Sequence, residues 1–322
     1  MAERLDAFMA RAAAAYYAHG DGIGRDFTTA PEMSQAFGEC LGAWAAVTWG
    51  AMGTPSRVVL AELGPGRGTL MADVLRAADD VMPAFARAAE VHLVETSPRL
   101  RAAQNALLGT RVAAWHGDAA GLPDGPAILF ANEFFDALPI RQFIRHDAGW
   151  RERHVADGRF VDLPCQHEED APPGSIREVN EATLELAGRI GARLAAQGGA
   201  MLVLDYGPAE SGFGDTLQAL RGNARVDPLA APGEADITAH VDFAAMARAS
   251  GITAHGPLPM GIFLQRLGLM ARSAMLAQAS PGQAGAILAA AQRLVAPEGM
   301  GRLFKAMAIA HPSLATPAGF EA

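Results

Sequence analysis

Short apolar runs of strand length alternate along this chain with segments whose apolar residues recur at helical spacing. Several runs end directly in an acidic or amide side chain, a pattern typical of buried strands that deliver polar groups at their carboxyl ends. The pattern predicts an α/β protein built on a doubly wound sheet. The clearest runs are residues 58–60, 91–94, 127–131, 199–204 and 302–309.

The first fifty residues predict two helices separated by a glycine-rich loop. Apolar residues recur at helical intervals over 5–17, and a second helix is expected over about 26–50. Thr29 and Glu32 have the spacing of a capping box, with Pro31 in the first turn, where its missing N–H costs nothing. A well-capped helix explains these residues without any function. The alternative is that this dense group of polar residues, which precedes a buried strand, forms the lid of a pocket.

Residues 141–163 change to strict alternation and carry a strong hairpin signal, so they predict a small antiparallel insertion. Residues 176–197 are expected to form a long amphipathic helix, whereas residues 211–242 lack periodicity and read as a long loop. Because no repeat or long linker divides the chain, we expect a single domain over 1–322. Its parts are an N-terminal helical lid at 1–50, the β insertion at 141–163 and a substrate-side loop or insertion at 208–243.

Composition and charge narrow the class of protein. The chain has 322 residues, and no apolar run approaches the ~18 residues that a membrane span needs. A net charge of −9 argues against nucleic acid and anionic membranes, which favour clustered Lys and Arg. Cys40 and Cys165 lie far apart without metal-ligand spacing, so neither a disulfide nor a metal site is indicated. Residues 1–15 lack the features of a signal or transit peptide, and we expect a cytoplasmic bacterial protein.

The strand at 58–60 runs into a glycine-rich turn that predicts a ligand site. Glu62 is followed by glycines at alternate positions, Gly64, Gly66 and Gly68, and then by a helical segment. Glycines permit positive φ and close approach of a ligand, and the helix start presents free N–H groups. The spacing differs from the G-x-G-x-x-G pattern of dinucleotide sites. It suits a nucleoside with an amino-acid tail, such as S-adenosylmethionine.

Two further strand ends carry acids in positions suited to that ligand. Glu95 ends the next strand, where an acid in a doubly wound sheet reaches ribose hydroxyls. A terminal Glu at a helix N-terminus is also favourable without any ligand. Asp118 follows another short strand and is placed to contact an adenine amino group, although an ordinary loop Asp would look the same.

The segment 132–139 follows the most apolar strand and combines an amide, two carboxylates and two aromatic rings. Carboxylates beside aromatic walls can hold a guanidinium or an ammonium in a fixed orientation. We therefore single out Glu133 and Asp136; the alternative is that the rings are core and Glu133 caps a helix. Asp205 ends a later strand. His240 is a candidate general base or, alternatively, a hydrogen-bonded structural residue.

Taken together, these stretches resemble the S-adenosylmethionine-dependent methyltransferase family that includes bacterial MidA-like proteins and the mitochondrial complex I assembly factor with protein-arginine methyltransferase activity. The matching segments span nearly the whole chain in the expected order; they are 26–39, 62–73, 95–98, 132–139, 204–207, 216–222, 236–243 and 304–305. The family's tyrosine-bearing stretch is reduced here to residues 15–18, and the double-Glu loop of better-known arginine methyltransferases is absent.

The resemblance implies a class I, Rossmann-like, seven-stranded and mostly parallel sheet with helices on both faces and an insertion. It also implies S-adenosyl-L-methionine at the glycine turn, with Glu95 on the ribose and Asp118 near the adenine. The full set of implied cofactor-binding residues is Glu62, Gly64, Pro65, Gly66, Gly68, Glu95, Thr96, Asp118, Asn132, Thr29 and Pro31.

By the same resemblance the favoured acceptor is an arginine of a protein, such as a respiratory complex I subunit during assembly. Transfer is an in-line displacement that needs alignment more than acid–base power. Glu133 would orient and polarise the guanidinium, Asp136 or Asp205 would assist, and no metal is required. Two alternatives stay open. One is a non-catalytic, S-adenosylmethionine-binding assembly factor or scaffold for a respiratory complex; the other is a nicotinamide-dependent oxidoreductase, which the glycine spacing disfavours.

Overall fold

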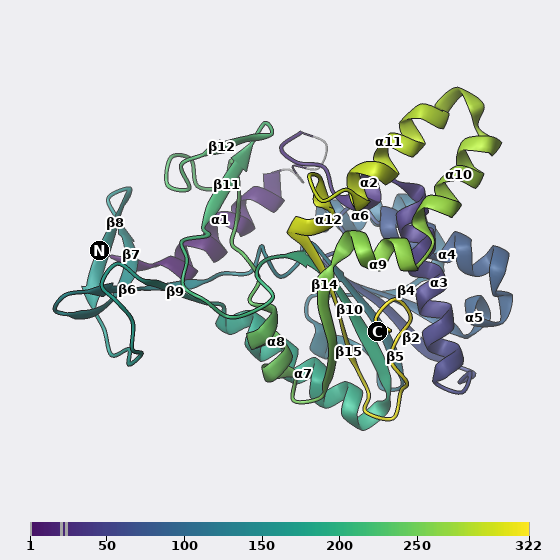
Figure 1. The fold of residues 1–322 in the computed structure, drawn as a ribbon, viewed down its shortest axis with the longest axis horizontal. Coiled ribbons are helices and arrows are strands. Elements are labelled where there is room, and N and C mark those ends of the chain that lie inside the picture. The colour runs from purple at the N-terminus through teal and green to yellow at the C-terminus, as the bar shows by residue number, and fades with distance from the viewer. Residues whose placement is uncertain (1, 20–21, 23–24, 322) are drawn as a thin grey trace.

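The computed structural model describes residues 2–19, 22 and 25–321. One seven-stranded sheet forms the centre of the fold (Figure 1). Its strands are β2 (Val58–Leu63), β3 (Ala89–Val94), β4 (Val112–His116), β5 (Ala127–Asn132), β10 (Gly199–Tyr206), β14 (Thr253–Pro259) and β15 (Phe304–Ala310). They lie in the order β14-β15-β10-β5-β2-β3-β4, and β15 runs antiparallel to both of its neighbours while the other pairs are parallel. The predicted doubly wound α/β fold is thereby confirmed.

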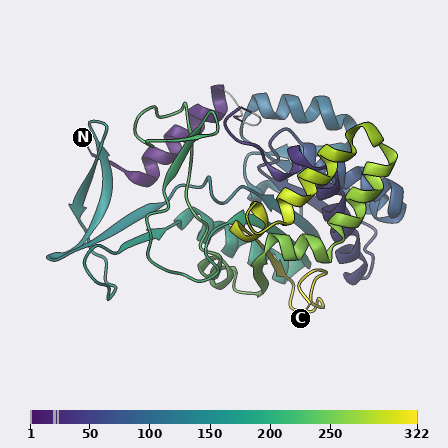
Figure 2. The ribbon, with the colours of Figure 1, turned by 45° about the horizontal axis from the view of Figure 1, so that its top comes forward.

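Helices cover both faces of this sheet (Figures 1 and 2). They are α2 (Ala30–Met33), α3 (Gln35–Ala51), α4 (Thr69–Val81), α5 (Pro83–Ala88), α6 (Pro98–Leu108), α7 (Glu181–Gln197), α8 (Phe243–Ser250), α9 (Met260–Arg266), α10 (Leu269–Ala279), α11 (Ala284–Val295) and α12 (Met300–Leu303). Leu60 of β2 shares a core with apolar residues of α3, α4 and α9, whereas its neighbours Val59 and Ala61 share one with α7 and α8. Burial on both faces explains why these strands read as unbroken apolar runs.

A second sheet forms the smaller lobe, at the left of Figure 1. Its strands are β1 (Glu3–Arg4), β6 (Arg141–His146), β7 (Gly149–Ala156), β8 (Arg159–Pro164) and β9 (Ile176–Val179). Strands β6, β7 and β8 are the antiparallel insertion expected from the alternation. Asp157 and Gly158 have φ of 50° and 70° and form the tip between β7 and β8. These positive φ values are what a two-residue hairpin turn requires.

A third, small sheet occupies the segment for which we expected an irregular loop, and that expectation is wrong. Its strands are β11 (Gln218–Arg221), β12 (Ala224–Val226) and β13 (Asp236–Thr238), in the order β12-β11-β13. Ala219 and Ile237 of this sheet share a core with Leu5 and Phe8 of helix α1 (Leu5–His19). Strands of three or four residues are too short to show a clear alternation in sequence.

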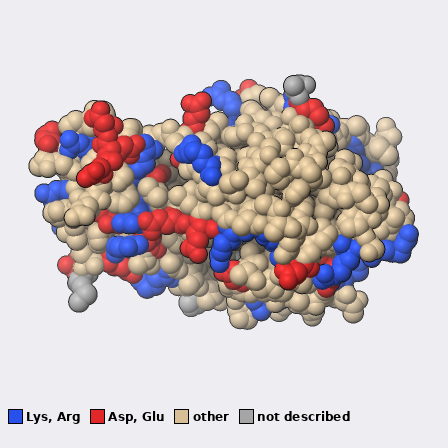
Figure 3. Space-filling view, turned by 90° about the horizontal axis from the view of Figure 1, so that it is seen from below, with Lys and Arg blue, Asp and Glu red and all other residues tan. Residues whose placement is uncertain are grey.

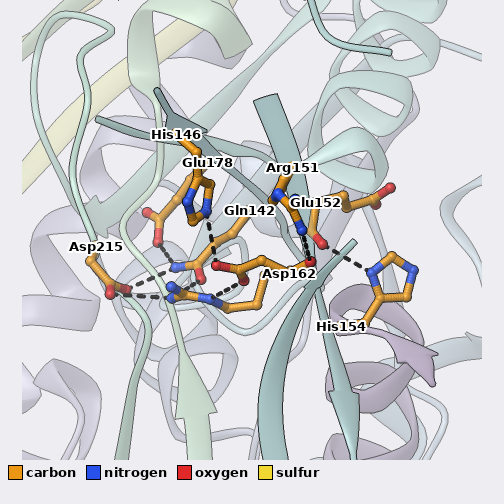
Figure 4. Close-up of polar contacts among 9 residues, drawn as sticks. Gln142, His146, Arg151, Glu152, His154, Asp162, Glu178 and Asp215 are labelled. Carbon is orange, nitrogen blue, oxygen red and sulfur yellow. Dashed lines mark hydrogen bonds and ion pairs between the residues drawn. The ribbon is translucent and has the colours of Figure 1, made fainter. Parts of the chain in front are cut away.

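Polar contacts fasten the second sheet to the chain that leads into the third (Figure 4). The buried Gln142 of β6 donates from Nε2 to Glu178 Oε1 at 2.7 Å and to Asp215 Oδ1 at 2.9 Å. Arg153 of β7 donates to the side-chain oxygen Oε1 of Gln142 at 2.8 Å, and the backbone N–H of Thr216 donates to Glu178 at 2.9 Å. The start of β11 is therefore held in place by the insertion.

Several element boundaries differ from the expected ones for local reasons. The helix expected over 26–50 is divided at Ser34, which has extended φ and ψ between α2 and α3. The helix expected from 176 begins at Glu181, because residues 176–179 pair with β6 and Asn180 caps the helix by accepting from Thr183 N–H at 2.9 Å. Residues 302–303 of the last expected strand belong to α12, and β14 and α9 were not expected at all.

The surface mixes both signs of charge. Seen from below, acidic and basic side chains lie next to one another on the smaller lobe and along its border with the larger one (Figure 3). From this side the larger lobe shows a broad area of uncharged residues. Over the described residues, no helix combines the length and the apolar character needed to cross a bilayer.

Candidate functional site

The point where the chain order reverses lies between β2 and β5. These two strands are parallel neighbours; from β2 the chain proceeds to β3 and β4 on one side, and from β5 to β10 on the other. In doubly wound sheets a crevice opens at the carboxyl ends of such a pair, and ligands bind there. The glycine turn follows β2 and the segment 132–139 follows β5, so both candidate stretches flank this crevice.

The glycine turn has the geometry that its sequence predicts. Gly64, Gly66 and Gly68 have φ of 63°, 52° and 89°, and Gly68 stands directly before α4. The N–H of Gly68 donates to Pro65 O at 2.7 Å and closes the turn. A Cβ placed on Gly64 would lie 2.7 Å from the Phe134 ring. Glycine at 64 therefore allows the close approach of the Phe134 ring, and the first turn of α4 begins beside a backbone that carries no side chain at these three positions.

Glu62 is the acid at the end of β2. Its side chain is only 3% exposed, burial raises its pKa to about 8, and its Oε2 has no partner among the described residues. A buried oxygen without a partner costs free energy unless a proton or a ligand donor satisfies it. Glu62 thus fits a site that is completed by the donor of a bound cofactor.

Glu95, next to the end of β3, is held by two contacts. Its Oε1 accepts from the N–H of Ser97 at 2.7 Å, and Oε2 lies 3.4 Å from Nε2 of Gln104; burial raises the pKa of this carboxyl. Thr96 connects Glu95 to Ser97, which caps α6 as its sequence predicts. Asp118 is more exposed and caps a single turn of 3-10 helix by accepting from Ala120 N–H at 2.7 Å. Their contacts to a cofactor stay predictions.

Gln104 is a positioning residue that no sequence pattern marks. It is completely buried in α6, and its Nε2 donates to the carbonyl oxygen of Gly66 at 2.7 Å. Its own carbonyl oxygen accepts from Nε1 of Trp115 at 2.8 Å. Gln104 therefore joins the glycine turn, Glu95 and β4 in one hydrogen-bonded unit. A mid-helix glutamine gives no local signal, since its three partners all lie outside its own helix.

The segment after β5 turns sharply at Glu133, whose φ is 50° although it is not glycine. Its Oε1 accepts from the N–H of Ala30 at 3.2 Å and from Asn132 Nδ2 at 3.3 Å. No regular helix follows within 133–139, so Glu133 does not cap one. A left-handed glutamate costs about 1–3 kcal/mol and is a feature that clusters at functional sites.

Asp205 at the end of β10 holds the backbone of this turn by hydrogen bonds. It is fully buried, and its Oδ2 accepts from the N–H groups of Phe134, Phe135 and Asp136 at 3.2, 2.9 and 3.3 Å. Its Oδ1 accepts from the N–H of Tyr206 at 2.9 Å. Because both oxygens are occupied by the backbone, we assign Asp205 to positioning the segment, in place of the assisting role in transfer that the sequence suggested.

Three carboxylates come together on the acceptor side of the crevice: Glu133, Asp136 and Asp236 of β13. Burial raises the pKa of Asp136 to about 6. Burial, together with the smaller effect of the Asp136 charge, raises the pKa of Glu133 to about 8 and that of Asp236 to about 7. Within the described residues none of the three forms an ion pair with Lys or Arg, and Asp136 Oδ1 has no partner. The site therefore concentrates carboxyl groups whose ionised forms a bound cation would stabilise.

Asp236 was not among the candidates drawn from the local pattern, because its segment read as a loop. It lies in the 236–243 match to the methyltransferase family, which is the signal that could have found it. His240 lies four residues further on. Its ring meets the Tyr206 ring edge to face, with the two centroids 5.5 Å apart, and its backbone N–H donates to Thr216 Oγ1 at 2.8 Å. Burial lowers the pKa of His240.

The N-terminal segment crosses the ends of three strands of the sheet. Ser97 Oγ donates to Tyr17 O at 3.1 Å, Ala30 N–H donates to Glu133, and Thr69 Oγ1 donates to Glu32 Oε1 at 2.6 Å. The predicted capping box is wrong. The side chain of Thr29 makes no hydrogen bond to the first turn of α2, and the Glu32 carboxylate accepts from Thr69 beside the glycine turn. Pro31, buried in α2, belongs to the same crossing segment. These contacts support the lid that we proposed for 1–50.

The raised pKa values predict how pH affects the stability of the ligand-free protein. For Glu133 the folded pKa of about 8 exceeds the ordinary 4.5, so the folded state binds more protons between these values. Since stability falls with pH wherever the folded state holds the extra proton, we expect the free energy of unfolding to fall from about pH 5 to about pH 8. Urea unfolding across this range should show a smaller fall in Glu133→Gln, whose side chain cannot ionise. Equal falls in both proteins would contradict the assignment.

Among the described residues, no three His, Cys, Asp or Glu side chains are grouped closely enough to hold a metal ion.

Comparison with known proteins places these features in context. Residues 40–258 match the family described as putative S-adenosyl-L-methionine-dependent methyltransferase. "Protein arginine methyltransferase NDUFAF7 homolog, mitochondrial" of Drosophila melanogaster is 35% identical over 96% of this chain and 80% of its own length. The human "Protein arginine methyltransferase NDUFAF7, mitochondrial" is 33% identical over 96% and 79%.

Among solved structures, a likely methyltransferase from Burkholderia thailandensis bound to S-adenosyl-homocysteine is similar to this chain. It has a TM-score of 0.81 and 25% identity, over 99% of this chain and 90% of its own. The relatives' names overturn one expectation. We expected a cytoplasmic location from residues 1–15, but the relatives that match most of this chain are named as mitochondrial proteins. The composition of a folded domain does not record its compartment.

Proposed function

Because this chain belongs to the family of S-adenosyl-L-methionine-dependent methyltransferases, we propose that it methylates an arginine side chain of a protein. S-adenosyl-L-methionine is its cofactor. The observation that carries the proposal is the group formed by the half-buried Glu133 and the buried Asp136 and Asp236, which has no cation among the described residues. A guanidinium is a wide, planar cation with several N–H donors, so it can bond to carboxylates that lie on separate elements.

The cofactor-side residues fit this chemistry. We propose that the backbone at 64–68 and Glu62 receive the amino-acid tail, and that Glu95 and Thr96 receive the ribose, with Asp118 and Asn132 at the rim and Thr29 and Pro31 in the lid. The partnerless Oε2 of Glu62 and the positive φ values of the turn support this placement. When bound, the cofactor supplies an electrophilic methyl group on a sulfonium.

On the acceptor side the chain's own residues orient the nucleophile and accept a proton. We propose that Glu133 and Asp136 hold the guanidinium by charge-assisted hydrogen bonds, so that one nitrogen is aligned for the displacement. That nitrogen loses a proton as the methyl group arrives. A carboxylate whose pKa lies between about 6 and about 8 is suited to receive this proton near neutral pH. Asp205 keeps the segment 134–136 in place.

The acceptor protein is proposed to be a respiratory complex I subunit, on the resemblance of this chain to complex I assembly factors. An experiment that needs no prior choice of acceptor tests the function. The purified protein is incubated with methyl-tritiated cofactor and an extract from host cells that lack this gene, and the labelled proteins are hydrolysed to amino acids. Label in methylarginine is expected. Label in another amino acid, or no label above that given by Gly66→Val, would contradict the proposal.

A further inference from the structure

Strand β13 carries a carboxylate from the third sheet to the edge of the main sheet. Asp236 opens β13, and three residues later the chain hydrogen-bonds to the crevice: Ala239 N–H donates to Asp136 O at 2.9 Å and Val241 N–H donates to Tyr206 O at 3.0 Å. Asp236 is therefore attached to both strand ends that carry the acceptor site. It reaches that site from an element more than a hundred residues after β5 in sequence.

The side chain of Asp236 is buried, and among the described residues it has one hydrogen-bond partner. It is 8% exposed, and its Oδ1 accepts from the hydroxyl of Tyr17 at 3.3 Å. Tyr17 lies in α1, and its carbonyl oxygen accepts from Ser97 Oγ beside Glu95. One tyrosine thus contacts the cofactor side through its backbone and the acceptor side through its hydroxyl. The charge of Asp136 acts on both Tyr17 and Asp236, so the three side chains lie close to one another.

We propose that Asp236, oriented by Tyr17, is a further acceptor-binding carboxylate and selects arginine over lysine. The inference rests on the proposed function and adds to it. Glu133 and Asp136 bind the guanidinium from the end of β5, and Asp236 binds it from β13. Two carboxylate positions on separate elements suit the planar guanidinium fork, whose nitrogens point in different directions. An ammonium is a compact point charge and cannot reach both.

The test measures binding of two blocked tripeptides, acetyl-Gly-Arg-Gly-amide and its lysine counterpart, to the protein saturated with S-adenosylhomocysteine. The variants are Asp236→Asn, Tyr17→Phe and the control Glu234→Gln, an exposed glutamate two residues before Asp236. Asp236→Asn should weaken binding of the arginine peptide about 10- to 100-fold, the effect of losing a charged hydrogen bond. Tyr17→Phe should weaken it by a smaller factor, and Glu234→Gln should leave it unchanged. The preference for arginine over lysine should shrink in Asp236→Asn and, to a smaller extent, in Tyr17→Phe, and it should not change in Glu234→Gln.

The outcomes separate this inference from the function on which it rests. If the wild-type protein binds neither peptide and methylates no arginine, the proposed function fails. If it binds the arginine peptide and Asp236→Asn binds it equally well, Asp236 is not an acceptor carboxylate and the function stands.

A merely structural role is distinguished by the cofactor. Asp236→Asn should keep its affinity for S-adenosylhomocysteine within twofold and raise KM for the acceptor more than it lowers kcat. If Asp236→Asn does not fold, Tyr17→Phe tests the inference instead, because it removes only the hydroxyl that donates to Asp236. If Tyr17→Phe bound the arginine peptide as tightly as the wild-type protein and kept the same preference for arginine over lysine, the inference would be overturned.

Discussion

Gly66→Val is expected to weaken binding of S-adenosylhomocysteine at least about 100-fold, which corresponds to ~2.8 kcal/mol. Gly66 has a φ of 52°, a conformation that a β-branched residue rarely adopts and that costs about 1–3 kcal/mol. Relief of this strain would move the carbonyl oxygen that accepts from Gln104. The new side chain would also occupy the turn along which the amino-acid tail of the ligand is expected to lie.

Isothermal titration of the two proteins measures this effect. Gly50→Val is the matched control, because Gly50 is exposed near the end of α3 and a Cβ there meets nothing within 4 Å. The control should bind like the wild-type protein, and thermal unfolding should show that Gly66→Val remains folded. If folded Gly66→Val kept wild-type affinity, the cofactor would not lie at this turn.

Glu133→Gln is expected to lower kcat for arginine methylation by about 10²- to 10³-fold, within the usual range for loss of an acid–base group. Glutamine keeps the size of the side chain and the carbonyl oxygen that can accept from Ala30 N–H. It removes the negative charge that orients the guanidinium and the group that receives the proton. Affinity for S-adenosylhomocysteine should stay within twofold of wild type, because Glu133 lies on the acceptor side of the crevice.

Steady-state methylation assays with an arginine acceptor check this prediction, with Glu185→Gln, an exposed position of α7, as control. Unchanged turnover and unchanged acceptor binding would show that Glu133 has neither role. The same variant separates the enzyme from a scaffold. If Glu133→Gln has lost methyl transfer, binds the cofactor and still supports assembly of a respiratory complex in cells, the binding role rather than catalysis would be the essential one.

The sequence predicted the structure correctly where the conformation of a segment depends on residues within that same segment. The strand before Glu62, the alternating glycines and the helix after Gly68 all appear as expected, since apolar runs and glycines act on their own backbone. The cap at Ser97 is equally local, because its oxygen bonds an N–H three residues away. Glu32 shows the limit of this reasoning: the capping spacing was present, but a hydroxyl on Thr69 bonds to the same carboxylate.

The sequence by itself determined the α/β class, the strand–turn–helix at the glycines and the carboxylates that follow β5. Only the tertiary structure decided which residues meet there. It brought Gln104 to the backbone of Gly66, Asp205 to the N–H groups of 134–136, and Tyr17 to Asp236 on the acceptor side of the crevice. These contacts join residues that are far apart along the chain, and they exist because the sheets and α1 bury their apolar faces against one another. Periodicity records which face of a segment is buried, but it does not record the partner against which that face packs.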